Sequence, residues 1–305
     1  MVLSVTESWR RRRRAMGIRL ITMNTLVGVI RLAHPFPTAL NALLAGLFMY
    51  LASPVVHVGR VVTLAVSVAA IHGAIGSLND YCDYPLDRRG KPSKPLVQGI
   101  VGRRFARSQA LVLALTGLVL SQALGWSTVC FAVVVLLAGA SYDVWAKGTL
   151  VSWVPFAIFV PSLPLWAFAA SGRFEFRLLS AYPLGILLSL GLNVANTLPD
   201  VEADTAHGVQ GLTHKIGVRR GIILAWASFA GTILGLAGAL PFLGNDGQLP
   251  SCGLIAATLV LVLMIGDYAI FRSHRSLQRT WYASTVLSAL IGLAWVASLA
   301  KMGRM

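Results

Sequence analysis

The chain has 305 residues, of which 56% are hydrophobic and only 12% charged, and its mean hydropathy is +0.72. This composition excludes a disordered chain and an ordinary soluble domain, and it is typical of an integral membrane protein. The net charge of +15 would suit a nucleic-acid partner. However, the basic residues lie in short polar segments between long uncharged ones, which argues against nucleic acid and for a role in membrane orientation.

The N-terminal segment, residues 1–31, is predicted to be basic and cytoplasmic, and residues 32–305 to form a single transmembrane domain. The segment contains the run Arg10 to Arg14, and no small-residue cleavage site follows its first apolar stretch. We interpret it as a retained anchor at anionic headgroups. A tail that only sets the topology is an equally open alternative.

Uncharged stretches predict an all-α integral membrane fold with nine transmembrane helices, since each crossing needs about 20 residues. One stretch is too long for a single helix and is divided at Gly125-Trp126-Ser127. The predicted helices cover residues 33–52, 60–80, 106–124, 127–146, 150–170, 178–198, 220–243, 251–271 and 280–299.

The distribution of basic residues predicts the orientation. With a cytoplasmic N-terminus, all but five of the 26 Lys and Arg residues lie on the cytoplasmic side. The five exceptions are Arg60, Arg173, Arg177, Lys301 and Arg304. We therefore expect the N-terminus to be cytoplasmic and the protein to lie in the cell (plasma) membrane.

Two acidic clusters stand out in a chain that has only 11 acidic residues. The first follows the helix at 60–80, and the second repeats its spacing 117 residues later, after the helix at 178–198. Because four crossings separate them, both clusters emerge on the same, cytoplasmic face. This predicts two pseudo-repeated four-helix halves around a central cavity. The clusters are Asn79, Asp80, Asp83 and Asp87, and Asn196, Asp200, Glu202 and Asp204.

Residues four apart on a helix are offset by about 40°, so each cluster is predicted to form one polar stripe. Glu202 points away from the second stripe and is ranked below its neighbours. Pro85 either kinks or ends the first helix, which makes the first stripe less secure than the second.

The polar loops beside the clusters, within about 79–104 and 196–219, are predicted to form a lid over the site. Both contain several Gly or Pro residues. Lys91, Lys94 and Lys215 in these loops are candidates for binding phosphate oxygens, with surface charge as the open alternative.

The clustered carboxylates predict a cation, because two such charges about 4 Å apart repel by roughly 4 kcal/mol at an effective dielectric near 20. Oxygen ligands without a Cys or His cluster favour Mg²⁺ shared with substrate phosphates. This pattern is typical of diphosphate ionisation, in which an allylic carbon–oxygen bond breaks towards a carbocation. Tyr81, Tyr142 and Trp145 are candidates to shield that cation, and membrane-interface belt residues otherwise.

The segment from Asn79 to Asp87, followed by Lys94-Pro95-Leu96, resembles the first signature of the UbiA superfamily of intramembrane prenyltransferases. The segment from Asn196 to Asp204, followed by Gly208 and Gly217, resembles the second, and His34-Pro35-Phe36-Pro37 resembles the N-terminal segment. The resemblance implies a nine-helix fold with a lateral opening to lipid, a polyprenyl diphosphate donor and transfer to an aromatic or other lipophilic acceptor.

The resemblance also implies roles for individual residues. Asn79 and Asn196 would orient the donor or the acidic ligands, and Lys94 stands where many members have Arg. The residues implied around Mg²⁺ and diphosphate are Asp80, Asp83, Asp87, Asp200 and Asp204, of which we expect Asp83 and Asp200 to be essential for catalysis.

A third segment, Ser141 to Gly148, resembles the family's stretch for diphosphate and acceptor binding, but it is shorter and lacks the Arg. The acceptor therefore need not be 4-hydroxybenzoate. Tyr142 and Lys147 are candidate substrate ligands. Asp143 is a candidate general base, and an ion pair with Lys147 at i+4 is the alternative.

Other functions remain open. Enzymes of the same fold that use a glycerol phosphate, a phosphoribosyl group or an intramolecular cyclisation would carry the same motifs. A cation-coupled transporter is the alternative from another class, but it should place ionisable residues near the middle of the membrane. Only Asp267 lies within a late helix.

Overall fold

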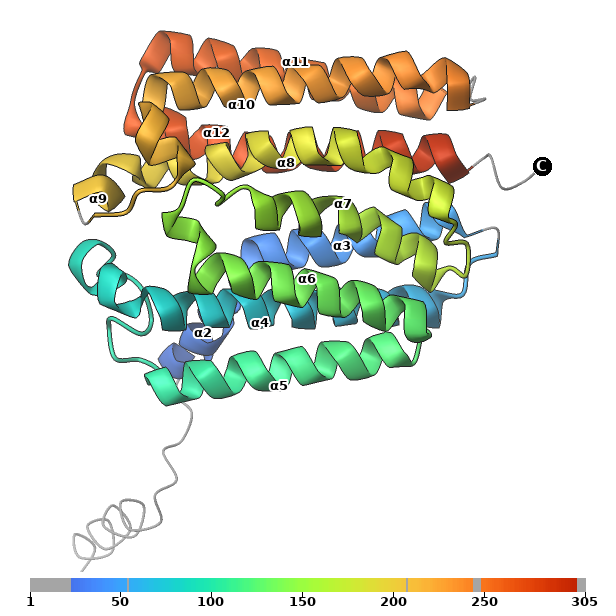
Figure 1. Ribbon diagram of the computed structural model, residues 1–305. Helices are drawn as coiled ribbons and strands as arrows, with labels where there is room; N and C mark the ends of the chain where they lie inside the picture. The colour runs from blue at the N-terminus through green and yellow to red at the C-terminus, as the bar shows by residue number, and fades with distance from the viewer. Residues whose placement is uncertain (1–22, 54, 207, 244–247, 301–305) are drawn as a thin grey trace, which may run out of the picture.

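The computed structural model describes residues 23–53, 55–206, 208–243 and 248–300, and Figure 1 shows long helices running side by side. Across these described ranges there is no β-strand, in agreement with the predicted all-α fold. Residues 1–22, including the run Arg10 to Arg14, lie outside the described residues.

The described helices follow one another with short connections. They are α2 (Met23–Leu32), α3 (Pro35–Ala52), α4 (Val58–Gly90), α5 (Arg103–Gln122), α6 (Trp126–Val144), α7 (Val154–Ala170), α8 (Tyr182–Thr197), α9 (Val201–Ala206), α10 (Leu212–Ala239), α11 (Gln248–Phe271) and α12 (His274–Ala300). Short 3-10 segments precede α8 and α9.

Within the described ranges, six helices are long and apolar enough to cross a membrane: α3, α4, α6, α10, α11 and α12. The remaining three predicted segments coincide with α5, α7 and α8, and α7 is apolar but only 17 residues long. The chain is thus an integral membrane protein by its helices, while the count of nine crossings stays a prediction.

Several helix boundaries differ from the predictions. Gly125, at φ 121, separates α5 from α6, so the predicted division is confirmed. Pro85 does not end the first cluster's helix, because α4 continues through it to Gly90. The predicted polar loop within 196–219 is partly helical, since α10 begins at Leu212 and is interrupted only at Gly217, whose φ is 77.

The buried apolar side chains form two main clusters. One joins mainly α3, α4, α6 and α7, and the other joins α8, α10, α11 and α12. Figure 1 shows α8, α10, α11 and α12 together on one side of the bundle. These two clusters do not by themselves establish a pseudo-repeat of two four-helix halves, which stays a prediction.

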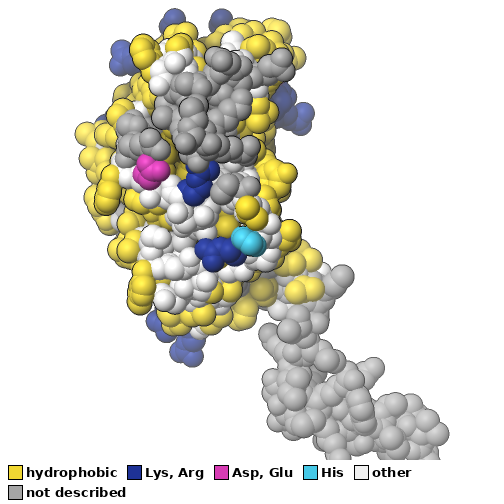
Figure 2. Space-filling view, turned by 90° about the vertical axis from the view of Figure 1, so that its right-hand side faces the viewer, with side chains coloured by type: hydrophobic (Ala, Val, Ile, Leu, Met, Phe, Trp, Pro, Cys, Tyr) yellow, Lys and Arg dark blue, Asp and Glu magenta, His cyan; other side chains and the backbone are white. Residues whose placement is uncertain are grey.

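Two arginines tie helix ends together at one end of the bundle. Arg60 donates to the carbonyl oxygens of Leu124 (3.2 Å) and Ala170 (2.8 Å). Arg173 donates to the carbonyl oxygen of Ala52 (2.8 Å). Figure 2 views this end, where few charged side chains lie among many hydrophobic ones. The acidic clusters lie at the other end, beside α2 and α9 (Figure 1).

Candidate active site

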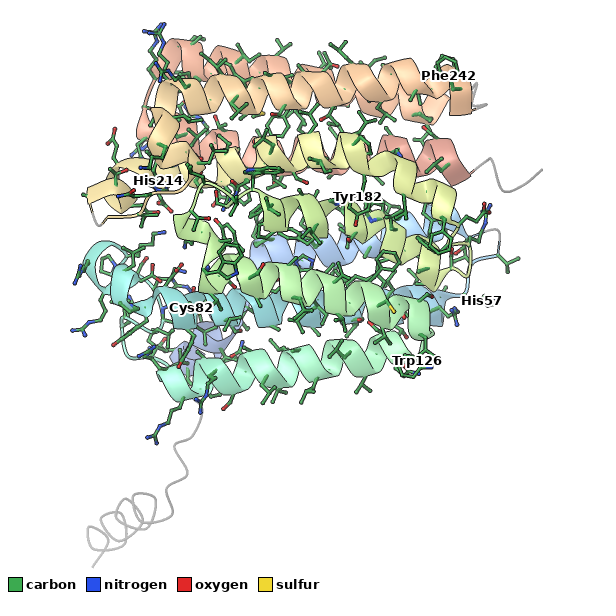
Figure 3. All side chains as sticks on the ribbon, viewed as in Figure 1. His57, Cys82, Trp126, Tyr182, His214 and Phe242 are labelled. Atoms are coloured by element: carbon green, nitrogen blue, oxygen red, sulfur yellow. The ribbon has the colours of Figure 1, made fainter. Side chains whose placement is uncertain are left out.

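The bundle encloses a cavity of about 700 Å³ that reaches both acidic clusters. Its cluster residues are Asn79, Asp80 and Asp83 from α4, and Asn196, Asp200 and Asp204 from the second segment. Figure 3 shows Cys82 and His214, which lie near the clusters in sequence, at the same end of the bundle. The part of the cavity lined by these acidic residues is called the polar end below.

The first cluster lies on the last turns of α4. This helix has 33 residues and is therefore about 50 Å long, so it extends beyond a hydrocarbon core about 30 Å thick. Asp80 is almost completely buried, at 1% exposure. Asp87 is also buried but does not line the cavity, and it contacts Lys94 at 3.7 Å.

The second cluster does not lie on one continuous helix. Asn196 is near the end of α8, Asp200 closes a 3-10 turn that contains Pro199, and Asp204 is on α9. The three residues therefore do not share one continuous α-helix, although all three line the cavity. Pro199 lacks a backbone N–H and so cannot continue the α-helical hydrogen bonding, whereas α4 accommodates Pro85 within a much longer helix.

Three lysines lie among the carboxylates. Lys94 hydrogen-bonds Asp80, and Lys147 hydrogen-bonds Asp83. Lys91 reaches across to the second cluster and donates to Asp200 at 2.7 Å. Each of these ion pairs joins two residues that line the cavity.

The lysine charges are stabilised by these pairs. Burial by itself favours the neutral amine, but the Asp200 carboxylate raises the pKa of Lys91 above its ordinary value. Likewise, burial opposes the charge of Lys147, and Asp83 outweighs it, so the pKa of Lys147 is also raised. Both amines therefore remain cationic at neutral pH.

Asp143 lies beside the first cluster at the end of α6. It is buried, at 7% exposure, and its Oδ1 accepts a hydrogen bond from Asn79 Nδ2 at 3.0 Å. The alternative of an ion pair with Lys147 does not form, because Lys147 turns to Asp83 instead. Asp143, Tyr142 and Lys147 all line the cavity, and their roles towards a substrate stay predictions.

Lys215 is the predicted substrate ligand that the structure does not bring to the cavity. It is exposed on α10 and is not among the lining residues. Its neighbour His214 lies 3.8 Å from Asp204. Burial alone would raise the pKa of Asp204, but His214 and the charges of Lys91 and Lys147 lower it below its ordinary value.

The three aromatic candidates for shielding a cation are also separated. Tyr142 lines the cavity, but Tyr81 and Trp145 do not. Tyr81 packs under the Arg103 guanidinium of α5 at 4.7 Å, and Trp145 is 59% exposed. Tyr81 and Trp145 therefore fit the alternative of membrane-interface residues, since neither is among the residues that line the cavity.

Other aromatic rings line the apolar part of the cavity. The sequence analysis did not predict them. Phe156 packs edge-on to Tyr142, with ring centroids 5.1 Å apart. Phe159 follows at 4.8 Å, and His72 lies edge-on to Phe159 at 6.2 Å. Their periodicity resembles that of ordinary core residues, so the sequence offered no signal that separated them from packing residues.

Residues before α3 also contribute to the polar end, which the sequence analysis did not predict. His34 Nε2 hydrogen-bonds Asp80 at 2.8 Å, and Arg31 donates to the Ser93 carbonyl oxygen at 2.7 Å. His34 has a left-handed backbone, with φ 48, just before Pro35 begins α3. The His-Pro pair was a usable signal, since proline at the first helical position places the preceding side chain at the helix entrance.

The donor set fits a divalent cation that is shared with a ligand. In the part of the chain that the structure describes, no three His, Cys, Asp or Glu residues converge closely enough to hold a metal by themselves. Mg²⁺ is ordinarily bound by one or two carboxylates together with substrate phosphates, so such a cage is not required. Asp80 Oδ2 is buried without a hydrogen-bond partner, which leaves an acceptor available at the polar end.

The sequence profile of the UbiA prenyltransferase family matches residues 39–287. The chain belongs to this family. The predicted resemblance and the prediction of a prenyltransferase are thereby confirmed, and the family match includes both acidic clusters and the segment that carries Asp143.

Curated relatives extend this result. Digeranylgeranylglyceryl phosphate synthase from Thermococcus gammatolerans is 28% identical over 268 residues, covering 85% of this chain and 94% of the relative. The enzyme of the same name from Methanoregula boonei is 29% identical over 230 residues, covering 73% of this chain and 80% of the relative.

Solved structures establish the same fold. A UbiA homologue from Aeropyrum pernix has a TM-score of 0.70 at 17% identity, covering 85% of this chain and 96% of that one. A UbiA homologue from Archaeoglobus fulgidus, solved with DMAPP and Mg²⁺, has a TM-score of 0.66 at 18% identity, covering 89% and 99%.

Proposed function

We propose that this UbiA-family protein transfers a prenyl group from a polyprenyl diphosphate to a lipophilic acceptor in a Mg²⁺-dependent reaction. The observation that carries the proposal is the meeting of both acidic clusters and three lysines at one end of an apolar cavity. Such a cavity suits a ligand with an anionic head and a hydrocarbon tail. Support for Mg²⁺ and a prenyl diphosphate also comes from the Archaeoglobus homologue.

In this proposal the polar end holds the diphosphate. Asp83 and Asp200 are essential metal ligands, with Asp80, Asp87 and Asp204 completing the acidic surroundings, and Asn79 and Asn196 orienting donor or ligands. Lys91, Lys94 and Lys147 exchange their carboxylate partners for phosphate oxygens when the donor binds. Mg²⁺ supplies positive charge that stabilises the departing diphosphate. Lys215, being outside the cavity lining, is a weaker candidate.

Asp143 is proposed to accept the acceptor's proton. The donor's allylic carbon–oxygen bond breaks, diphosphate leaves with the bonding electrons, and an acceptor oxygen or ring carbon bonds to the prenyl carbon. The proton released in this step passes to Asp143 Oδ2, which has no hydrogen-bond partner among the described residues. Asn79 holds the other carboxylate oxygen and thereby orients the base.

The acceptor is proposed to be the free hydroxyl of a prenylated glyceryl phosphate. The synthases from Thermococcus and Methanoregula support this choice over an aromatic acid, as does the absence of the expected Arg from the segment Ser141 to Gly148. An aromatic acceptor is the second candidate, because the family resemblance and the aromatic lining near Tyr142 would accommodate one.

An acceptor panel tests the proposal. Purified protein in lipid nanodiscs receives Mg²⁺, geranylgeranyl diphosphate and, in parallel, a monoprenylated glyceryl phosphate, 4-hydroxybenzoate or no acceptor, and products are identified by mass spectrometry. A diprenylated glyceryl phosphate supports the proposal. A prenylated aromatic acid would establish the second candidate, and a product without acceptor would indicate cyclisation.

We also propose that residues 32–305 form a single domain with nine crossings, and that the N-terminus and the polar end are cytoplasmic in the cell membrane. The excess of basic residues near the polar end supports this orientation. A membrane-impermeant thiol reagent applied to intact cells should label a cysteine placed at Arg173 and spare one placed at Gln98. The opposite pattern would invert the topology.

A further inference from the structure

His214 is a buried histidine that has no part in the proposed reaction so far. Its side chain is 4% exposed, and neither ring nitrogen has a hydrogen-bond partner among the described residues. Leaving a buried polar group unpaired costs about 1–3 kcal/mol, so such groups are rare in proteins. His214 lies at the end of the bundle that carries α9 (Figure 3), but it does not line the cavity. Any contribution to the site must therefore pass through a neighbouring residue.

That neighbour is Asp204, which does line the cavity. His214 Nε2 lies 3.8 Å from Asp204 Oδ2. A hydrogen bond from nitrogen to oxygen is about 2.7–3.2 Å long, so a displacement of about 1 Å would complete this one. The three lysines of the polar end are paired with other carboxylates, those of Asp80, Asp83 and Asp200. Among the described residues, His214 is thus the side chain placed to hold Asp204.

Asp204 needs such a contact because of the element that carries it. It lies on α9, a helix of only 6 residues. Helices this short are not stable by themselves, so their position depends on what they pack against. α9 packs against α10, whose first turn carries His214. The place of the Asp204 carboxylate therefore depends on α10.

The first turn of α10 is anchored to the rest of the site on two sides. Thr197, a cavity-lining residue at the end of α8, donates its hydroxyl to that of Thr213, which is 1% exposed. On the other side, a Cβ on Gly211 would lie 2.8 Å from the Lys147 carbonyl oxygen and 3.1 Å from His214 Nδ1. The missing side chain lets this turn approach Lys147 and leaves Nδ1 against Gly211. Nε2 is then the ring nitrogen that faces α9.

We propose that His214 is a positioning residue, which donates an Nε2–H hydrogen bond to Asp204 and so holds this carboxylate towards a metal-bound diphosphate. The inference rests on the proposed function, in which Asp204 belongs to the acidic surroundings of Mg²⁺. The neutral ring suffices, because its tautomer with hydrogen on Nε2 is a donor. Hydrogen bonds to the carboxylate ligands of a metal fix their orientation, and their loss typically lowers metal affinity or activity about tenfold to hundredfold.

Three substitutions of His214 separate this hydrogen bond from packing. His214→Gln keeps an amide N–H at about the reach of Nε2, His214→Asn keeps one only at the reach of Nδ1, and His214→Leu keeps none. We expect the Leu and Asn variants to weaken cation binding about tenfold to hundredfold and the Gln variant to stay close to the wild type. His274→Leu is the matched control, because His274 is exposed on α12 and outside the cavity.

The experiment measures cation binding rather than turnover. Purified protein in lipid nanodiscs receives geranylgeranyl thiodiphosphate, which is not hydrolysed, and Mn²⁺ in place of Mg²⁺, since both prefer octahedral oxygen ligands. Electron paramagnetic resonance of free Mn²⁺ gives the Kd. If His214→Leu does not fold, the comparison of Gln with Asn decides. Equal affinities in all variants, or a loss that Gln does not restore, would overturn the proposal.

A double-mutant cycle shows whether His214 acts through Asp204. Asp204→Ala removes the carboxylate, so His214→Leu should weaken Mn²⁺ binding little further in that background. If the two losses multiplied instead, His214 would act by another route and the positioning role would be wrong.

This proposal and the proposed function fail in distinguishable ways. If His214→Leu weakened Mn²⁺ binding and Gln restored it, but the wild type transferred no prenyl group to any acceptor, the reaction would be wrong and the positioning role would stand. If transfer were normal and no His214 variant changed the Kd for Mn²⁺, the positioning role would be wrong and the reaction would stand.

Discussion

Lys91 Nζ lies 2.7 Å from Asp200 Oδ2, and this contact joins two residues that are 109 positions apart in the chain. Lys91 follows α4 directly and belongs to the first acidic segment, whereas Asp200 belongs to the second. The pair therefore connects the two clusters across the polar end. In the proposed function, a divalent cation would neutralise Asp200 in place of Lys91, and the Lys91 amine would be free to bind a diphosphate oxygen.

Replacing Lys91 by methionine should weaken donor binding. The variant keeps an apolar stem but loses a charge-assisted contact to phosphate, so we expect kcat/KM for the donor to fall roughly tenfold to hundredfold. Lys215→Met is the matched control, since Lys215 is exposed and outside the cavity. Steady-state kinetics measure kcat/KM for the donor in both variants. Equal losses would restore Lys215 as a substrate ligand.

Asp143→Asn should separate chemistry from binding. The asparagine preserves size but cannot take up a proton, so kcat should fall by about 10²-fold or more if Asp143 is the general base. Binding of a thiodiphosphate donor analogue should change little. An unchanged kcat would exclude Asp143 as the base and leave it a structural partner of Asn79.

Substitutions of Tyr81 and Tyr142 should have different effects, although Tyr81 lies in the first acidic cluster and Tyr142 lies next to Asp143 in the chain. Tyr142→Leu removes a ring that lines the cavity, whereas Tyr81→Leu removes one that packs against Arg103. We expect Tyr142→Leu to reduce turnover and Tyr81→Leu to reduce mainly stability, by about 1 kcal/mol, typical of an exposed cation–π contact. A larger loss of turnover in Tyr81→Leu would contradict the position of this ring.

The sequence predicted those parts of the site that depend on residue spacing and on the number of membrane crossings between the clusters. Two clusters separated by an even number of crossings must meet at one end of the bundle, and Asp83 and Asp200 do line one cavity. The all-α fold and the division at Gly125 followed from the length of the apolar stretches, and in the structure Gly125 has the positive φ that glycine readily adopts.

Other features depend on tertiary contacts that spacing does not encode. An ion pair between Lys147 and Asp143 was an open alternative on local grounds, but Lys147 hydrogen-bonds Asp83, 64 positions away. Proline gave opposite results at two sites, since Pro85 is carried within α4 and Pro199 marks a break before α9. Phe48 lines the cavity but has no sequence signal that separates it from an ordinary core residue, because only the meeting of α3 with α12 gives it its position.

Arg60 should contribute to stability rather than catalysis. It donates to the carbonyl oxygens of Leu124 and Ala170 at the end opposite the acidic clusters. Arg60→Leu leaves these groups unpaired, so we expect a loss of about 1–3 kcal/mol in the free energy of unfolding.

Thermal unfolding in nanodiscs measures the effect of Arg60→Leu, with Arg107→Leu as the control because Arg107 is exposed. Donor kcat/KM, measured at a temperature where the variant is folded, should stay near the wild-type value. A selective loss of activity without loss of stability would contradict this structural role.

The central claim, that both acidic clusters act together on a metal-bound diphosphate, is tested most directly by Mg²⁺-dependent diphosphate release from a labelled prenyl diphosphate. Asp83→Asn and Asp200→Asn are compared with Glu202→Gln, whose exposed carboxylate lies in the second segment but outside the cavity. We predict that either aspartate variant abolishes release while remaining folded and that Glu202→Gln retains it. Full release by both aspartate variants would contradict the account.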